Sequence, residues 1–146
     1  MEVKKILWPT DLSGNAHKAM PLVTSLSMKY NCEVHVLYVI EELALHEPWY
    51  GEFYSSRIGE IHAWERQKAE ERLNSICEEH LKGCPMYVRH IAIGEPADEI
   101  LKLVPYEGID MVVMAKRGRR GRFSFGSVTE KVLKSVSVPI IVVPTE

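Results

Sequence analysis

Short apolar segments rich in β-branched residues alternate with segments of helical periodicity along this chain of 146 residues. The β-prone segments are residues 3–8, 34–40, 86–93, 111–115 and 139–143. Most are apolar along their whole length rather than at every second residue, which is typical of parallel strands buried on both faces. Because right-handed crossovers leave few arrangements, we predict an α/β fold with an open, doubly wound, five-stranded parallel sheet and helices on both faces.

Helical segments are predicted between these strands. The first carries an apolar stripe at three- and four-residue steps, formed by Ala16, Met20, Val23, Leu26 and Tyr30. Pro21 should kink it. The second is a long polar helix over residues 57–82, and the third begins at Pro96. The fourth, over 127–136, opens with the Ser-x-x-Glu spacing of a capping box. No linker or repeat interrupts the pattern, so we predict one domain over residues 1–146.

Composition and charge exclude several classes of protein. The net charge of −2 gives no general reason to expect nucleic acid as a partner. No apolar run approaches the ~20 residues that span a bilayer, and the first residues lack a signal-peptide pattern. Three cysteines without tight spacing are typical of a reduced protein. We therefore expect a cytoplasmic protein with neither nucleic-acid nor membrane partners. Six scattered histidines have no ligand spacing, so no metal site is predicted.

The segment 115–129 carries the strongest functional pattern. In an open parallel sheet, ligands bind beyond the carboxyl ends of the strands, and this segment follows the fourth strand. It combines Gly118, Gly121 and Gly126 with Ser127 at the start of a helix, and it carries five cations: Lys116, Arg117, Arg119, Arg120 and Arg122. Helix N-termini attract anions, so the pattern favours phosphate binding. The alternative is that the glycines only form turns and Ser127 only caps its helix.

Several separated motifs resemble the universal stress protein family in order and over essentially the whole chain. They are Ile6–Ser13 with its Asp-x-Ser turn, Gly94-Glu95-Pro96, Ala115–Gly118, Gly126–Leu133 and Val138–Val143. The resemblance implies an adenine nucleotide alpha hydrolase-like sheet with strand order 3-2-1-4-5. It also implies that the chain binds ATP or another adenine nucleotide, with Mg²⁺ bridging the phosphates of a triphosphate.

The same resemblance implies the binding residues. Pro9, Thr10, Asp11 and Val39 would form the adenosine pocket. The nucleotide site would be completed by residues around the fourth strand and the glycine loop, namely Met114, Ala115, Arg117, Gly118, Gly126, Ser127, Val128 and Thr129. Two alternatives remain open from the residues themselves: Asp11 could instead cap the first helix, and Val39 could be an ordinary core residue.

The loop departs from the ATP-binding family signature at two points. Ala115 stands where that signature has its first glycine, and seven residues rather than nine separate Gly118 from Gly126. A nucleotide-binding regulatory protein with an unknown protein partner is therefore one hypothesis, and a nucleotide-free interaction module of the same fold is a second. The third, a nucleotide-processing enzyme, lacks an identifiable nucleophile or base, so we expect no enzyme and only slow or incidental hydrolysis.

Two further segments bear on assembly and access. The last strand, 139–143, should lie at the edge of the sheet, and an exposed apolar edge is a pairing hazard unless it is covered. Family members commonly dimerise by pairing this strand antiparallel with its twin, so we predict a homodimer. The aromatic segment 41–56 is interpreted either as a loop folded over the core or as a mobile lid near the pocket.

Overall fold

The computed structural model describes residues 2–41, 58–81, 86–116 and 125–145. Its strands are β1 (Lys5–Pro9), β2 (Glu33–Ile40), β3 (Met86–Ile93), β4 (Met111–Ala115) and β5 (Ile140–Val143). Its helices are α1 (Gly14–His17), α2 (Met20–Tyr30), α5 (Ile58–His80), α6 (Pro96–Glu107) and α7 (Phe125–Ser135). The segment 41–56 falls almost wholly outside the described residues, so neither interpretation of it is tested.

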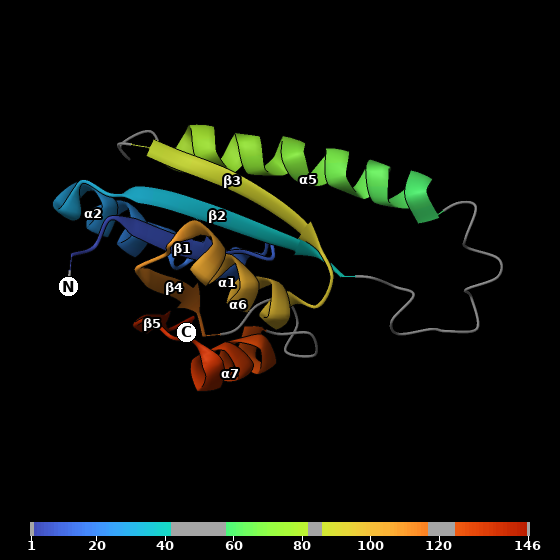
Figure 1. Cartoon of the computed structure of the whole chain (residues 1–146). Helices are drawn as coiled ribbons and strands as arrows, with labels where there is room; N and C mark the ends of the chain where they lie inside the picture. The colour runs from blue at the N-terminus through green and yellow to red at the C-terminus, as the bar shows by residue number, and fades with distance from the viewer. Residues whose placement is uncertain (1, 42–57, 82–85, 117–124, 146) are drawn as a thin grey trace.

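The strands form one parallel sheet with the order β3-β2-β1-β4-β5 (Figure 1). This confirms the predicted fold class and strand order. Strand β1 lies at the centre, with Leu7 opposite His35 of β2 and Val112 of β4. Among the described residues strand β5 pairs with β4 alone, and it lies at one edge of the sheet, as predicted. Strands β1, β2 and β4 therefore end close together at the carboxyl edge of the sheet.

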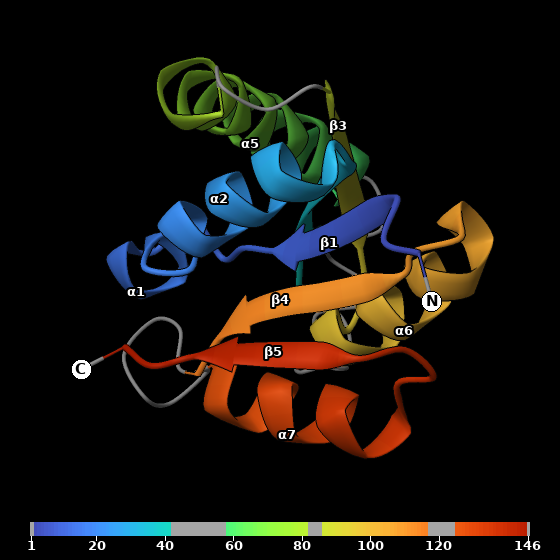
Figure 2. The ribbon, with the colours of Figure 1, turned by 90° about the vertical axis from the view of Figure 1, so that its left-hand side faces the viewer.

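Helices cover both faces of the sheet (Figure 2). Alternate residues of the central strand serve opposite faces: Ile6 and Trp8 pack with α2 and α5, whereas Leu7 packs with α6 and α7. All three side chains are fully buried. This double burial explains why the strands are apolar along their length. Within the described ranges, no helix combines the length and apolarity needed to cross a membrane.

The first helical segment differs from its prediction. It is divided into α1 and α2, and Pro21 lies in the first turn of α2 rather than in the middle of a kinked helix. Proline is well tolerated there because the first N–H groups of a helix have no intrahelical partner. Tyr30, predicted on the buried stripe, is 49% exposed at the end of α2. The polar helix α5 instead follows its prediction, with Ala69, Leu73 and Ile76 buried.

Two histidines lie in contact on the α6 face of the sheet. Nδ1 of His35 is 2.9 Å from Nε2 of His90, and the rings stack with an interplanar angle of 12°. Burial, followed by the neighbouring His90, lowers the pKa of His35 below its ordinary value of 6.5. Burial also lowers the pKa of His90. Both imidazoles are therefore neutral at neutral pH.

The free energy of unfolding should fall as the pH drops through 6.5, the ordinary histidine pKa. Below that value the unfolded chain takes up protons at both histidines, whereas the folded chain resists them, so the unfolded state gains stability. The charges of Glu33 and Glu107 raise the pKa of His35 and so oppose the effect of burial, whereas Lys5 lowers it further. Glu107 also raises the pKa of His90. Urea unfolding on both sides of this pH checks the prediction. His90→Gln should flatten the dependence; a slope equal to that of the unmodified chain would contradict the prediction.

Candidate functional site

A cavity lies at the carboxyl edge of the sheet, between the ends of β1 and β2 and the first turns of α6 and α7. It is lined by Pro9, Thr10, Asp11, Leu37, Val39, Glu41, Pro96, Ile100 and Val128. All four residues predicted for the adenosine pocket are among these, together with Val128, one of the residues predicted to complete the nucleotide site. The volume enclosed is about 50 Å³. The position agrees with the rule that ligands of an open parallel sheet bind beyond the carboxyl ends of its strands.

The turn after β1 is fixed by side-chain to backbone hydrogen bonds. Thr10 is 2% exposed, and its Oγ1 accepts a bond from the N–H of Leu12 at 3.0 Å. Asp11 Oδ1 accepts from the N–H of Ser13 at 2.9 Å, and Ser13 Oγ caps α1 by accepting from the N–H of Ala16 at 3.2 Å. Ser13 is therefore the N-cap of the first helix, and the alternative that assigned this role to Asp11 is wrong.

Leu12 holds a backbone conformation that is costly for a branched side chain. Its φ is 65°, in the left-handed region, where L residues lose about 1–2 kcal/mol. The side chain is buried at 5% exposure, and the carbonyl oxygen accepts a bond from Arg72 Nη2 of α5 at 3.2 Å. Backbone strain of this kind persists only where surrounding contacts impose it, and it gathers at functional sites. Leu12 directly follows Asp11, which lines the cavity.

The end of β4 is buried under α7. Met114 and Ala115 have 0% and 1% exposure, and Thr129 Oγ1 donates a hydrogen bond to the Ala115 carbonyl oxygen at 3.1 Å. Thr129, at 6% exposure, thus joins α7 to the strand. Ala115 and Thr129 do not line the cavity; their hydrogen bond holds α7 against the end of β4.

Replacing Thr129 by valine should lower the free energy of unfolding by about 1–3 kcal/mol, because the buried Ala115 carbonyl oxygen loses this donor. Urea unfolding provides the measurement. The matched change Thr24→Val, at a partly exposed position of α2, should cost no more than about 0.5 kcal/mol. If both variants lost the same free energy of unfolding, the hydrogen bond from Thr129 to the Ala115 carbonyl would not be what stabilises this region.

Helix α7 begins earlier than predicted. It already includes Phe125, so Ser127 lies in the first turn rather than at the N-cap, and the capping-box prediction is wrong. Ser127 is exposed, and Gly126 and Val128 are partly exposed. Arg117 and Gly118 lie outside the described residues, as do the remaining arginines of the loop. Lys116, at the end of β4, is exposed.

An ion-pair cluster connects the helices on either side of the cavity. Lys131 Nζ of α7 lies 3.1 Å from Asp98 Oδ1 and 3.3 Å from Glu95 Oε2, both near the start of α6. Hydrogen bonds to Asp98 and then Glu95 raise the pKa of Lys131. Glu95 also caps α6 by accepting from the N–H of Asp98 at 2.8 Å. The exposed cluster adds little stability, but it helps to keep Pro96 and Val128 on opposite walls of the cavity.

Sequence reasoning missed four residues of the cavity: Leu37, Glu41, Pro96 and Ile100. Three of them had a usable signal. Leu37 precedes Val39 by two residues and Glu41 follows it by two, which is the spacing of side chains on one face of a strand. Pro96 starts a helix directly after the third strand, at the same edge of the sheet. The contribution of Ile100 depends on packing between helix and sheet, which no local pattern records.

The model of the universal stress protein family matches residues 2–144. The chain belongs to this family. The match confirms the resemblance carried by the sequence motifs, and it covers the β1 turn as well as the start of α7.

Relatives of this universal stress protein domain agree with that assignment. Universal stress protein MJ0577 of Methanocaldococcus jannaschii is 30% identical over 156 residues, spanning 96% of this chain and 94% of that protein. Its solved structure matches with a TM-score of 0.83 at 29% identity, covering 100% and 99% of the two chains.

Two more distant solved structures share the fold. A universal stress protein from Archaeoglobus fulgidus in complex with dAMP has a TM-score of 0.66 at 18% identity, covering 97% of this chain and 98% of that one. A universal stress protein in complex with cAMP has a TM-score of 0.63 at 16% identity, with full coverage of both chains.

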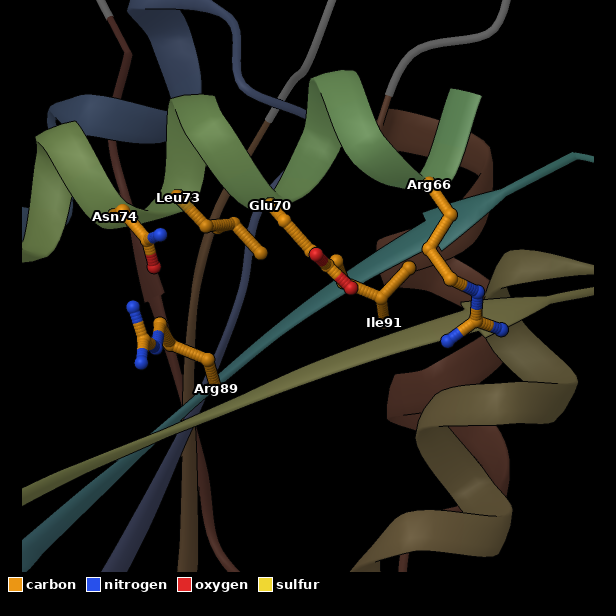
Figure 3. A pocket seen from close by; sticks show the side chains of 6 residues that line it. All are labelled: Arg66, Glu70, Leu73, Asn74, Arg89 and Ile91. Carbon is orange, nitrogen blue, oxygen red and sulfur yellow. The ribbon is translucent and has the colours of Figure 1, made fainter. Parts of the chain in front are cut away.

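A second hollow of this universal stress protein domain lies between α5 and β3 (Figure 3). It encloses about 310 Å³ and is lined by Arg66, Glu70, Leu73, Asn74, Arg89 and Ile91. Figure 3 shows Arg89 of β3 and Asn74 of α5 pointing toward each other across it. Its two arginines make it a rival location for an anionic ligand.

Proposed function

We propose that this chain is a regulatory protein that binds an adenine nucleotide and acts as a homodimer. The observation that carries the proposal is the cavity shared by Pro9, Thr10, Asp11 and Val39 with Val128 of α7. It brings an apolar wall, a carboxylate and the start of a helix to one point. The dAMP and cAMP complexes formed by two proteins of the same fold support the choice of ligand.

Each part of the cavity suits one part of a nucleotide. Leu37, Val39 and Ile100 offer apolar surface to a purine. The carboxylates of Asp11 and Glu41 can accept hydrogen bonds from ribose hydroxyls or an exocyclic amino group. Phosphates would extend away from these carboxylates toward the first turn of α7, where backbone N–H groups and the helix dipole favour anions. Mg²⁺, if a triphosphate binds, would neutralise phosphate charge there.

Ligand entry requires the cavity to widen. Its volume of about 50 Å³ is well below the ~300 Å³ at which ligand pockets begin. Thr10 and Ile100 are buried, so moving them would break packing contacts. The partly exposed lining residues are Asp11, Val39, Glu41 and Val128. We infer that these four side chains move outward when a base enters.

We infer regulation rather than catalysis from the hydroxyl groups at the site. Thr10 Oγ1 accepts a backbone hydrogen bond from Leu12, and Thr129 Oγ1 donates one to the Ala115 carbonyl. Within the described part of the chain, neither hydroxyl is paired with a histidine or carboxylate that would activate it as a nucleophile. Hydrolysis of a bound triphosphate would therefore be slow or incidental, and the nucleotide would act by stabilising one conformation of the domain.

Strand β5 supports the homodimer. It lies at the edge of the sheet, and its four residues, Ile140–Val143, are all apolar and all partly exposed. Antiparallel pairing with the same strand of a second copy would cover this edge. Light scattering at micromolar concentration should give twice the chain mass; a monomer would contradict the dimer without bearing on nucleotide binding.

Calorimetric titration with ATP and Mg²⁺ tests the nucleotide site. We expect saturable binding of one nucleotide per chain and weaker binding of CTP, since a pyrimidine fills less of the apolar wall. Asp11→Asn keeps an oxygen for the Ser13 N–H but removes the charge, so affinity should fall roughly tenfold. Arg89→Gln, in the hollow between α5 and β3, should leave the affinity unchanged. If Arg89→Gln lost binding and Asp11→Asn did not, the nucleotide would be assigned to that hollow instead.

A nucleotide-free interaction module is the second candidate. It is favoured by the small volume of the cavity and by Ala115, a buried residue at the position where the family signature carries glycine. Ala115→Gly separates the two candidates. If nucleotide binds only to Ala115→Gly, the unmodified chain is an interaction module. If the unmodified chain binds nucleotide equally well, the interaction module is excluded.

A further inference from the structure

His35, His90 and Glu107 form a cluster that is separate from the nucleotide cavity. They come from the third residue of β2, the fifth residue of β3 and the last residue of α6. One nitrogen of each histidine and one carboxylate oxygen of Glu107 all lie within 4.8 Å of one another. The nucleotide cavity is contacted by the opposite end of α6, at Pro96. The two sites can therefore be studied independently.

The distance between the two ring nitrogens is close to that in a metal site. Nδ1 of His35 and Nε2 of His90 are 2.9 Å apart. Two nitrogens bound tetrahedrally to zinc at 2.0–2.1 Å lie about 3.3 Å apart, so the two nitrogens must separate by a few tenths of an ångström and the rings must turn until both lone pairs point at the ion. His35 is only 2% exposed and is held within the sheet, whereas Glu107 is partly exposed in the last turn of α6. Its carboxylate has the freedom to close the remaining gap.

The protonation states of the two histidines are also compatible with metal binding. Burial lowers the pKa of both histidines, so both are neutral ligands at neutral pH. The contact between the two rings requires one hydrogen between their nitrogens. On metal binding that hydrogen moves to the other nitrogen of its own ring, so no proton need be released from the pair. Glu33 and Glu107 add negative charge beside the histidines, and Lys5, whose Nζ donates to the Glu107 carbonyl at 2.9 Å, partly offsets it.

The second nitrogen of His35 has the environment expected behind a metal ligand. His35 Nε2 is buried and makes no hydrogen bond within the described part of the chain. It lies 3.9 Å from Glu33 Oε1, whose side chain is 32% exposed and able to turn. Histidines that bind metals usually donate their other N–H to a carboxylate or carbonyl. With a metal at Nδ1, Nε2 would carry the hydrogen and Glu33 would accept it.

We propose that His35 Nδ1, His90 Nε2 and a carboxylate oxygen of Glu107 bind a divalent transition-metal ion, with zinc as the preferred ion. Two imidazoles and one carboxylate are a recurrent donor set for zinc. His90 also lines a groove of about 510 Å³ together with Leu103 and Tyr106. The groove gives the ion a path of entry and leaves room for water as the fourth ligand. Bound there, the ion would fix the end of α6 to β2 and β3.

Titration of the full chain, stripped of metal and free of nucleotide, with Zn²⁺ tests the proposal. Calorimetry should give one ion per chain with micromolar or tighter affinity, and thermal unfolding should shift upward. Replacement with Co²⁺ should give the visible absorption of a four-coordinate ion with nitrogen and oxygen ligands. His90→Gln should abolish binding, and Glu107→Gln should weaken it by at least about tenfold. Circular dichroism of the metal-free variants checks that they fold.

His62→Gln, at a partly exposed position of α5, is the matched control and should bind as the unmodified chain does. Three results would overturn the proposal. One is the absence of a saturable site at micromolar Zn²⁺, and another is unchanged affinity in folded His90→Gln. The third is a sulfur-to-cobalt charge-transfer band, which would place the ion on cysteine thiolates instead. None of these results bears on nucleotide binding.

Discussion

Ser127→Glu should weaken the binding of an adenine nucleotide by at least about tenfold while leaving the fold intact. Ser127 is exposed in the first turn of α7, where the proposal places the phosphates. A carboxylate there would occupy the anion-attracting end of the helix and repel a phosphate a few ångströms away. At an effective dielectric constant of 20, that repulsion reaches about 4 kcal/mol at 4 Å before screening by salt. The same carboxylate favours the helix by about 0.3–1 kcal/mol.

The control for this variant is Ser135→Glu, at the exposed end of the same helix. It changes residue type and net charge identically but lies at the carboxyl end of α7. Nucleotide affinity should stay within about twofold of the unmodified chain, since charges separated by more than ~10 Å are largely screened at ordinary salt. Calorimetry on both variants gives the comparison. Equal affinities in Ser127→Glu and Ser135→Glu would place the phosphates elsewhere.

Leu7→Ala should reduce the free energy of unfolding by about 2–5 kcal/mol. Leu7 lies at the centre of β1, between β2 and β4, and is fully buried against α6 and α7. Truncation leaves a cavity that a five-stranded sheet cannot close, because strand spacing is fixed by the hydrogen bonds on both sides. This loss is a large fraction of the ~5–15 kcal/mol by which a domain is stable.

Leu133→Ala is the matched control, because it makes the same truncation at a residue of α7 that is 54% exposed. It should change the free energy of unfolding by no more than about 0.5 kcal/mol. Urea unfolding followed by circular dichroism measures both variants. A small loss in Leu7→Ala would show that the centre of the sheet can repack, and the described core would then be wrong in its central strand.

The strands were predictable because each carries its own signal. A run such as Ile6, Leu7 and Trp8 has no polar face, and only a sheet covered on both sides buries all three side chains. The division of the first helical segment was harder to foresee. Apolar spacing continues from Ala16 through Met20, and Pro21 is compatible both with a kink inside one helix and with the first turn of a new helix.

The site was predictable to the extent that its residues follow strand ends. Asp11 and Val39 could be placed at the carboxyl edge from sequence, whereas the bond from Arg72 to the Leu12 carbonyl joins residues 60 positions apart. His35 and His90 are 55 positions apart, and their contact depends on the register of β2 against β3. Scattered histidines therefore gave no metal signal, because the information lies in strand pairing rather than in spacing along the chain.

A crystal structure of the chain grown with millimolar ATP and Mg²⁺ would show directly whether a nucleotide occupies the cavity. We expect a purine between Val39 and Ile100, with Asp11 within hydrogen-bond distance of the nucleoside and the phosphates at the first turn of α7. A cavity that keeps its present side-chain positions and contains no base under these conditions would contradict this expectation.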